Sequence, residues 1–154
     1  MITCTRRIQF CAGHRVHGHE GKCRHLHGHN YVVMFTAEAK LDKIGRVIDF
    51  GVLKERLGSW IDRKWDHGLL LWDGDTVAKA AAGAVPGQKV FYLPANPTAE
   101  NMANYLLHTV GPEQMVGTGV TLTAVRIWET ENCYADASLT EAARSSGTCG
   151  GQHA

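Results

Sequence analysis

The chain reads HGHNYVVMFTAEA from His27 to Ala39, with the apolar residues Tyr31 and Val33 at alternate positions. A period of two is typical of a β-strand that buries one face. His27 and His29 have the same parity as Tyr31, so their side chains lie on that face. The pattern therefore predicts a long strand over residues 27–39 that carries two imidazoles on its apolar side.

The segment before this strand has a similar pattern. Residues 6–13 alternate between apolar and polar side chains, and His14 continues the parity of Phe10 and Ala12. We expect a second strand here, with a third imidazole at its end. Residues 15–26 are rich in glycine, histidine and charge, which favours a loop between the two strands.

Two amphipathic helices are predicted further along the chain. Asp49 is a suitable N-cap for a helix over residues 50–64, where apolar side chains recur at helical spacing. Asn96 is a suitable cap for a second helix, with Pro97 in its first turn. Gly111-Pro112 is expected to end that helix.

The remaining elements are shorter. Residues 119–129 alternate again and predict a strand, and residues 134–139 predict a short final one. Residues 72–96 are less regular, with a helical turn expected at Val77–Ala82 and an extended piece at Val90–Leu93.

The order of these elements predicts an α+β fold. Because no helix separates consecutive strands, we expect a four-stranded antiparallel sheet with both helices on one face. Such a sheet has two open edges, which favours oligomerisation. We expect a single domain over residues 1–139 and a flexible tail over residues 140–154.

Composition excludes several classes of protein. The chain has 154 residues, and its 16 Lys and Arg nearly balance its 15 Asp and Glu, which argues against a nucleic-acid binder. It has no apolar run of the ~20 residues that a membrane span needs, and we expect no signal peptide. Five cysteines without paired spacing favour a reduced, cytoplasmic protein.

Histidine is the residue in excess. Six of the nine histidines lie in one short stretch: His14, His17, His19, His25, His27 and His29. Two imidazoles at i and i+2 of a strand are roughly 6.6 Å apart at Cβ and can converge on one zinc ion. A third nitrogen from His14 leaves one coordination position open, as catalytic zinc sites do. The alternative is that these are ordinary surface histidines.

Cys23 lies four residues before His27, between the cations Lys22 and Arg24. A zinc ion and positive neighbours lower the pKa of a thiol, so Cys23 is a candidate base or nucleophile. Alternatively, Cys23 is a structural zinc ligand together with His25, His27 and His29.

Three further residues are candidates for acid–base chemistry. Asp66 precedes His67, and a carboxylate beside an imidazole can orient it for proton transfer. A polar helix end is the simpler explanation of this dipeptide. Glu129 continues the apolar face of the strand over residues 119–129, and a buried carboxylate needs partners such as the N–H groups of a heterocycle. Strand fraying would instead expose Glu129 to solvent.

The motifs together resemble those of the 6-pyruvoyl-tetrahydropterin synthase and 6-carboxy-tetrahydropterin synthase family. The matching segments appear in the family's order and cover most of residues 6–134: Phe10-Cys11-Ala12-Gly13-His14, Cys23-Arg24-His25-Leu26-His27-Gly28-His29, Val47-Ile48-Asp49-Phe50, Asp66-His67, Pro97-Thr98-Ala99-Glu100-Asn101 and Glu129-Thr130. The resemblance implies the tunnelling fold, with subunits assembled into rings, here a hexamer, and with sites between subunits.

The resemblance also implies roles for individual residues. Zinc is bound by three of them: His14, His27 and His29. Cys23 is the catalytic thiol, and a proton relay is formed by Asp66, His67 and Glu129. Glu129 also anchors the pterin edge, in a pocket lined by Thr98 and Glu100.

The Cys-x-x-x-His-Gly-His spacing resembles the bacterial queuosine-pathway branch of the family. That branch converts 7,8-dihydroneopterin triphosphate to 6-carboxy-5,6,7,8-tetrahydropterin, acetaldehyde and triphosphate, as part of 7-deazaguanine biosynthesis. The positive charges of Arg15, Lys22 and Arg24 would suit the binding of this triphosphate. One rival function is a 6-pyruvoyl-tetrahydropterin synthase, which eliminates triphosphate and keeps the three-carbon chain. The other is a zinc-binding module without catalysis.

Overall fold

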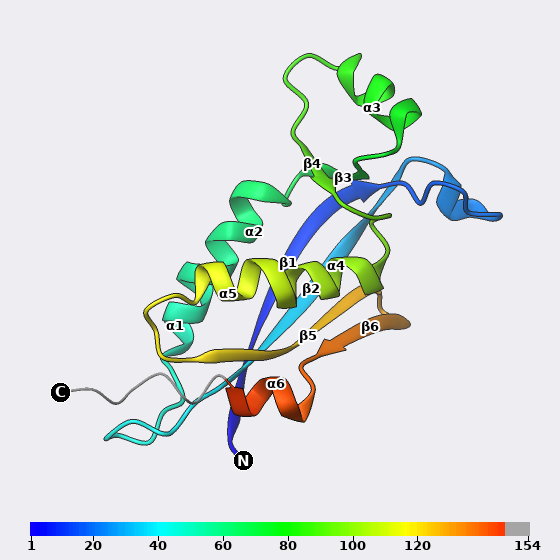
Figure 1. Ribbon diagram of the computed structural model, residues 1–154. Coiled ribbons are helices and arrows are strands. Elements are labelled where there is room, and N and C mark those ends of the chain that lie inside the picture. Colours follow the sequence, from blue (N-terminus) through cyan, green and yellow to red (C-terminus); the bar gives the residue numbers. More distant parts are fainter. Residues whose placement is uncertain (147–154) are drawn as a thin grey trace.

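A mixed β-sheet is the framework of the computed structural model, which describes residues 1–146 (Figure 1). Within these residues the sheet has six strands in the order β4-β3-β1-β2-β5-β6. The strands are β1 (Thr3–His14), β2 (His27–Glu38), β3 (Gly68–Trp72), β4 (Val90–Leu93), β5 (Thr121–Thr130) and β6 (Cys133–Ser138). The fold class is therefore α+β, as the sequence predicts.

The four strands predicted from alternation are confirmed, and they pair in an antiparallel manner. β1 and β2 form a long hairpin that runs from the pair Thr3–Glu38 to the pair His14–His27. β5 pairs with β2, and β6 pairs with β5. The loop predicted between β1 and β2 is also present, with a short 3₁₀ turn at Lys22–Arg24.

The prediction of a purely antiparallel four-stranded sheet is wrong, because β3 and β4 extend the sheet in parallel. Gly68 and Leu69 of β3 lie beside Ala12 and Gly13 of β1, and β4 lies beside β3. Sequence alternation could not reveal β3, because Leu70 and Leu71 are both fully buried. Leu71 packs against α3 (Thr76–Gly83), so both faces of this strand are covered.

The first predicted helix is confirmed over its whole length. It consists of α1 (Phe50–Leu53), a π-helical turn (Lys54–Gly58) and α2 (Ser59–Lys64). Asp49 caps it as expected, because its Oδ1 accepts a hydrogen bond from the Gly51 N–H at 2.7 Å. The predicted pieces at 77–82 and 90–93 are present as α3 and β4.

The second helix differs from the prediction at both ends. It comprises α4 (Ala99–Tyr105), a π-helical turn (Leu106–Val110) and α5 (Gly111–Gln114), and Thr98 caps it in place of Asn96. Gly111 lies inside the helix, with φ −55° and ψ −56°. A Cβ on Gly111 would lie 2.7 Å from Leu122 Cδ2, so this glycine permits close packing on β5 and does not end the helix.

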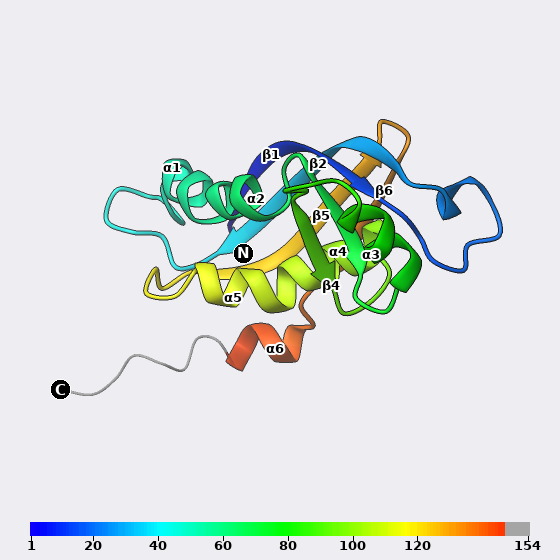
Figure 2. The ribbon, with the colours of Figure 1, turned by 90° about the horizontal axis from the view of Figure 1, so that it is seen from above.

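Both long helices cover the same face of the sheet, which Figure 2 shows from above. The main core lies between them and the sheet, where Phe10, Tyr31 and Phe35 pack with residues such as Leu57 and Met102. No helix among the described residues is long and apolar enough to cross a membrane. Beyond β6 the chain forms α6 (Glu141–Ser146), and residues 147–154 of the predicted tail lie outside the described residues.

Candidate active site

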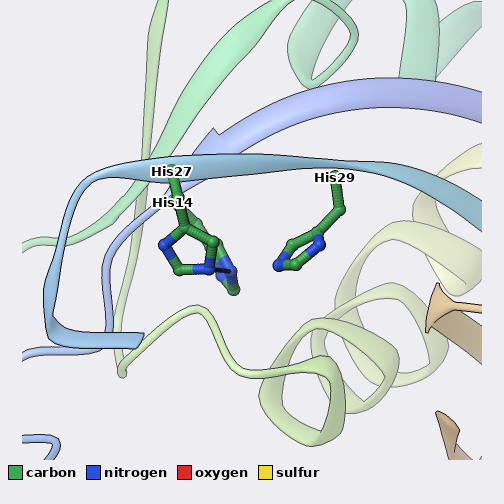
Figure 3. Close-up of side chains that lie close together, drawn as sticks. All are labelled: His14, His27 and His29. Atoms are coloured by element: carbon green, nitrogen blue, oxygen red, sulfur yellow. Dashed lines mark hydrogen bonds between the residues drawn. The ribbon is translucent and has the colours of Figure 1, made fainter. Parts of the chain in front are cut away.

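Three imidazoles meet where the β1–β2 hairpin opens into its loop (Figure 3). His14 ends β1 and pairs with His27 at the start of β2, and His29 follows two residues later. The potential ligand atoms of the three side chains lie within 4.8 Å of one another. Strand parity alone therefore gathers the three predicted metal ligands on the core face of the sheet.

Hydrogen bonds fix the orientation of two of these rings. His14 Nδ1–H donates to the Pro97 carbonyl oxygen at 2.7 Å, and His27 Nδ1–H donates to the His25 carbonyl oxygen at 2.7 Å. A neutral imidazole with a protonated Nδ1 presents a lone pair at Nε2. The two Nε2 atoms are 3.1 Å apart, so two lone pairs point into the same space.

This arrangement fits a bound metal ion. Two facing lone pairs repel unless a cation or a proton lies between them, and nitrogens on one tetrahedral zinc would be about 3.4 Å apart. His29 Nε2 is buried and has no hydrogen-bond partner. Burial, assisted by the neighbouring histidines, lowers the pKa of His14 to about 4, so its lone pair is free at neutral pH. Three imidazole nitrogens form a donor set that zinc favours.

The alternative zinc ligands do not join this group. Among residues 1–146, the group with metal-binding geometry consists of His14, His27 and His29. The His25 side chain is exposed, and its contribution is the backbone carbonyl that orients His27. The structure therefore does not assemble the set of Cys23, His25, His27 and His29 that a structural zinc module would use.

Glu129 lies beside the three histidines. It extends the buried face of Val125 and Ile127, but at the end of the sheet, where its side chain is 22% exposed. Its Oε1 is 3.5 Å from His29 Nε2. Glu129 thus lies beside the imidazole cluster because it points to the same face of β5 as Val125 and Ile127. β5 continues to Thr130, so the strand does not fray at Glu129.

Tyr31 is a site residue that sequence reasoning placed only in the core. Its ring contacts those of His14 and His29, and its buried hydroxyl has no hydrogen-bond partner. Burial, together with the negative charges of Glu129 and Cys23, raises the pKa of Tyr31 far above its usual value, so the hydroxyl stays protonated. In the sequence, Tyr31 could have been assigned to the site because it alternates in phase with His27 and His29.

Cys23 lies in the 3₁₀ turn of the loop and is partly buried. The Val16 N–H donates a hydrogen bond to its carbonyl oxygen at 2.9 Å. The loop that carries Cys23 joins His14 to His27, so the thiol lies at the same end of the hairpin as the histidines.

Asp66 and His67 form a tight pair. His67 Nδ1 is 2.8 Å from Asp66 Oδ2, and Asp66 Oδ1 accepts a hydrogen bond from the Cys11 N–H at 2.9 Å. Burial raises the pKa of Asp66, but the Cys11 and His67 hydrogen bonds and the charges of His67 and Lys89 outweigh it, and the net pKa is lowered. The carboxylate therefore stays ionised and orients the imidazole.

This pair does not meet the three metal-site histidines within one chain. His67 has φ 57°, and its side chain is 79% exposed. It shares a cleft with Cys11, Asn30 and His29, and by strand parity the side chains of Cys11 and Asn30 point to the sheet face opposite the rings of His14 and His29. The interaction of Asp66 with His67 is as predicted, but among residues 1–146 this pair is not part of the imidazole cluster.

Thr98 and Glu100 lie at the start of α4. Thr98 Oγ1 accepts a hydrogen bond from the Asn101 N–H and so caps the helix, and Glu100 is exposed in the first turn. The adjacent Pro97 carbonyl holds His14, which brings this helix start to the imidazole cluster. Their role in a pterin pocket stays a prediction.

In the predicted cationic cluster, one of the three positive side chains forms an ion pair within the chain. Arg15 Nε lies 3.0 Å from Asp75 Oδ2, and the Asp75 side chain is only 1% exposed. Lys22 and Arg24 are exposed. Arg15 is therefore already paired, and the exposed positive charge of the loop comes from the other two residues.

Comparison with known proteins adds sequence and structural relatives. The family model described as 6-pyruvoyl tetrahydropterin synthase matches residues 3–139. The chain is 44% identical over 137 residues to a 6-carboxy-5,6,7,8-tetrahydropterin synthase of Rickettsia bellii, which covers 88% of this chain and 99% of that protein. It is 38% identical over 120 residues to a probable enzyme of the same name from Halobacterium salinarum, covering 76% of this chain and 77% of the other.

Solved structures show the same fold. An uncharacterised protein from Wolinella succinogenes superposes with a TM-score of 0.74 at 23% identity, covering 89% of this chain and 97% of the other. The 6-pyruvoyl tetrahydropterin synthase of Caenorhabditis elegans superposes with a TM-score of 0.67 at 25% identity, covering 90% and 96%. The structural similarity therefore extends over nearly the whole of each chain.

Proposed function

Because the chain belongs to the 6-pyruvoyl tetrahydropterin synthase family, we propose that it is a 6-carboxy-5,6,7,8-tetrahydropterin synthase. Its substrate is then 7,8-dihydroneopterin triphosphate, and its place is in 7-deazaguanine and queuosine biosynthesis. The observation that supports this most is the convergence of His14, His27 and His29 beside Glu129, in a chain whose relatives carry that name.

The metal in this proposal is zinc, held by His14, His27 and His29. When bound there, zinc would act as a Lewis acid toward oxygen atoms of the substrate side chain. The chain's own contribution is to orient the imidazoles. Backbone carbonyls of Pro97 and His25 do this for two of the rings, and burial lowers the pKa of His14 to about 4.

The remaining groups on this side of the sheet handle the pterin and its protons. Glu129 is a half-buried carboxylate that can accept two adjacent N–H groups of a pterin edge. Cys23, next to the cations of its loop, moves protons at the side-chain carbons. Tyr31 keeps its proton and offers a donor beside His29.

The second acid–base pair comes from another subunit in our proposal. Asp66 and His67 open onto the opposite face of the sheet, so a second copy must bring His67 to the zinc side. Two strand edges support such an assembly. Among residues 1–146, β6 pairs only with β5, and the part of β1 from Thr3 to Cys11 pairs only with β2. Open edges of this kind can join copies into a ring, here a hexamer.

A product analysis tests the proposed reaction. The purified protein is incubated with 7,8-dihydroneopterin triphosphate, and the products are identified by mass spectrometry. Carboxy-tetrahydropterin with acetaldehyde supports the proposal, whereas pyruvoyl-tetrahydropterin identifies the sibling reaction. No turnover by a protein that retains its zinc would point to a binding module. The variant His29→Ala is the control for chemistry that does not depend on the site.

A further inference from the structure

Asp75 is a buried carboxylate with two kinds of partner. Its Oδ1 accepts a hydrogen bond from the Ala78 N–H at 3.0 Å, which caps α3. Its Oδ2 lies 3.0 Å from Arg15 Nε, and His17 Nδ1 is 3.8 Å from Oδ1. A carboxylate that is 1% exposed is costly unless it is paired, and Arg15 supplies the opposite charge at Oδ2 as an ion pair without a hydrogen bond.

Asn96 holds the next part of the same loop. Its side-chain oxygen accepts a hydrogen bond from the His17 N–H at 2.9 Å, and its side-chain N–H donates to the His17 carbonyl at 2.9 Å. The Asn96 carbonyl in turn accepts hydrogen bonds from Thr98 N–H and the Asn101 side chain, which tie it to the start of α4. One asparagine thus satisfies both backbone groups of His17.

The residue between these two anchored positions contacts Cys23. Val16 lies between Arg15 and His17, and its N–H donates to the Cys23 carbonyl at 2.9 Å. Most of the loop after residue 17 is exposed. One path from the folded body to Cys23 therefore runs through Asp75 and Asn96 to residues 15–17, and then across one hydrogen bond to the Cys23 carbonyl. The other runs along the chain from His27.

We propose that Asp75 and Asn96 are positioning residues that hold the loop over residues 15–26, so that Cys23 is fixed for proton transfer. This rests on the catalytic role of Cys23 in the proposed function. Both residues belong to the segment between β3 and α4, so the proposal also assigns a function to that segment. A misplacement of about 1 Å at a reacting group can cost up to roughly a hundred-fold in rate.

The variant Asp75→Asn separates the anchor from the helix cap. Asparagine caps helices about as well as aspartate, so α3 keeps its N-terminal hydrogen bond while the charge that holds Arg15 is lost. Arg15 is 23% exposed and can turn to water, so the protein is expected to fold. Asn96→Ala breaks the second anchor independently. Asp73→Asn is the matched control, since Asp73 belongs to the same segment but pairs with Lys79 on the surface.

The expected result is a fall in kcat of about ten- to a hundred-fold in Asp75→Asn and Asn96→Ala, with KM and zinc content unchanged. Hydrogen exchange of the Val16 amide, followed by mass spectrometry, should become roughly ten-fold faster in both variants. Asp73→Asn should match the parent protein in every measurement. A merely structural role would lower kcat, zinc content and substrate affinity together.

Two outcomes would overturn the proposal: an unchanged kcat despite faster exchange, or an unchanged exchange rate in both variants. Failure of the proposed function is a separate result. In that case the parent protein gives no carboxy-tetrahydropterin, while the exchange measurement still reports on the two anchors.

Discussion

The Nε2 atoms of His14 and His27 face each other at 3.1 Å across the open end of the β1–β2 hairpin. Each ring is turned into this position by a hydrogen bond from its other nitrogen to a backbone carbonyl. The carbonyl of Pro97 comes from the start of the second helix, far along the chain. The imidazole cluster is thus formed by the hairpin, while one of its rings is oriented from the segment just before α4 and another from the hairpin loop.

Zinc content should depend on His29 and not on His25. We expect His29→Ala to lower bound zinc from one ion per subunit to nearly none, because two imidazoles hold the ion much more weakly than three. His25→Ala is the matched control, since only the backbone carbonyl of His25 takes part. Metal analysis by mass spectrometry checks both variants. Loss of zinc from His25→Ala would refute the assignment.

Mixing two inactive variants should restore activity if the site is shared. Cys23→Ala and His67→Ala should each be inactive alone, and Cys23→Ala should keep its zinc. Subunits unfolded together and reassembled at equal ratio should regain up to about one quarter of the parent activity, because some sites combine both intact groups. A mixture with no activity would place Cys23 and His67 in the same subunit's site.

Glu129→Gln should impair catalysis more than binding. The change keeps the size of the side chain but removes charge and one acceptor, which costs about 1.5–3 kcal/mol, or roughly ten- to a hundred-fold in pterin binding. Because the same carboxylate contacts His29, kcat/KM should fall further than affinity. Stability should be retained or slightly raised, since a half-buried charge has gone.

Steady-state kinetics, substrate binding and thermal melting test this prediction. Glu131→Gln is the matched control, since Glu131 is exposed two residues further on. Kinetics and a melting temperature equal to those of the parent would show that Glu129 does not anchor the pterin.

The stabilising effect of Asp66 should disappear in acid. The pKa of Asp66 is lower in the folded protein than in the unfolded chain. Its contribution is therefore complete above the unfolded value of about 3.9, and it is lost as the pH falls through the folded pKa. Asp66→Asn should be less stable than the parent at pH 7 by about 1 kcal/mol or less, since its partner His67 is largely exposed to solvent.

Denaturant melts of the parent and Asp66→Asn at several pH values test this. The difference in unfolding free energy should shrink steadily below pH 4. A difference that stays constant down to pH 2 would mean that the folded state does not favour the ionised Asp66.

The sequence predicted those parts of the fold that follow a simple period. Alternation located β1, β2, β5 and β6, and parity brought His14 to His27 and His29. It failed for β3, because a strand covered on both faces has no polar positions to mark its phase. It also misread Gly111, where the need for a glycine comes from Leu122 and not from the local backbone.

The site was predictable to a similar extent. Residue types and spacing pointed to the three clustered histidines and to the pairing of Asp66 with His67. The roles of Cys23 and Glu129 stay predictions. Residue types and spacing could not show that Arg15 is turned toward Asp75, because that contact joins two loops that lie far apart in the sequence. They also could not place His67 on the opposite face, since this depends on the parallel contact of β3 with β1.

That parallel contact has a consequence for the order in which the molecule assembles. The hairpin of β1 and β2 can form as soon as residue 38 has left the ribosome, because its pairing is local. β3, which follows His67, can dock only after the whole first helix has been made. The three histidines can thus come together early in biosynthesis, whereas the acid–base pair and the Pro97 carbonyl that orients His14 are added later, by slower, long-range steps of folding.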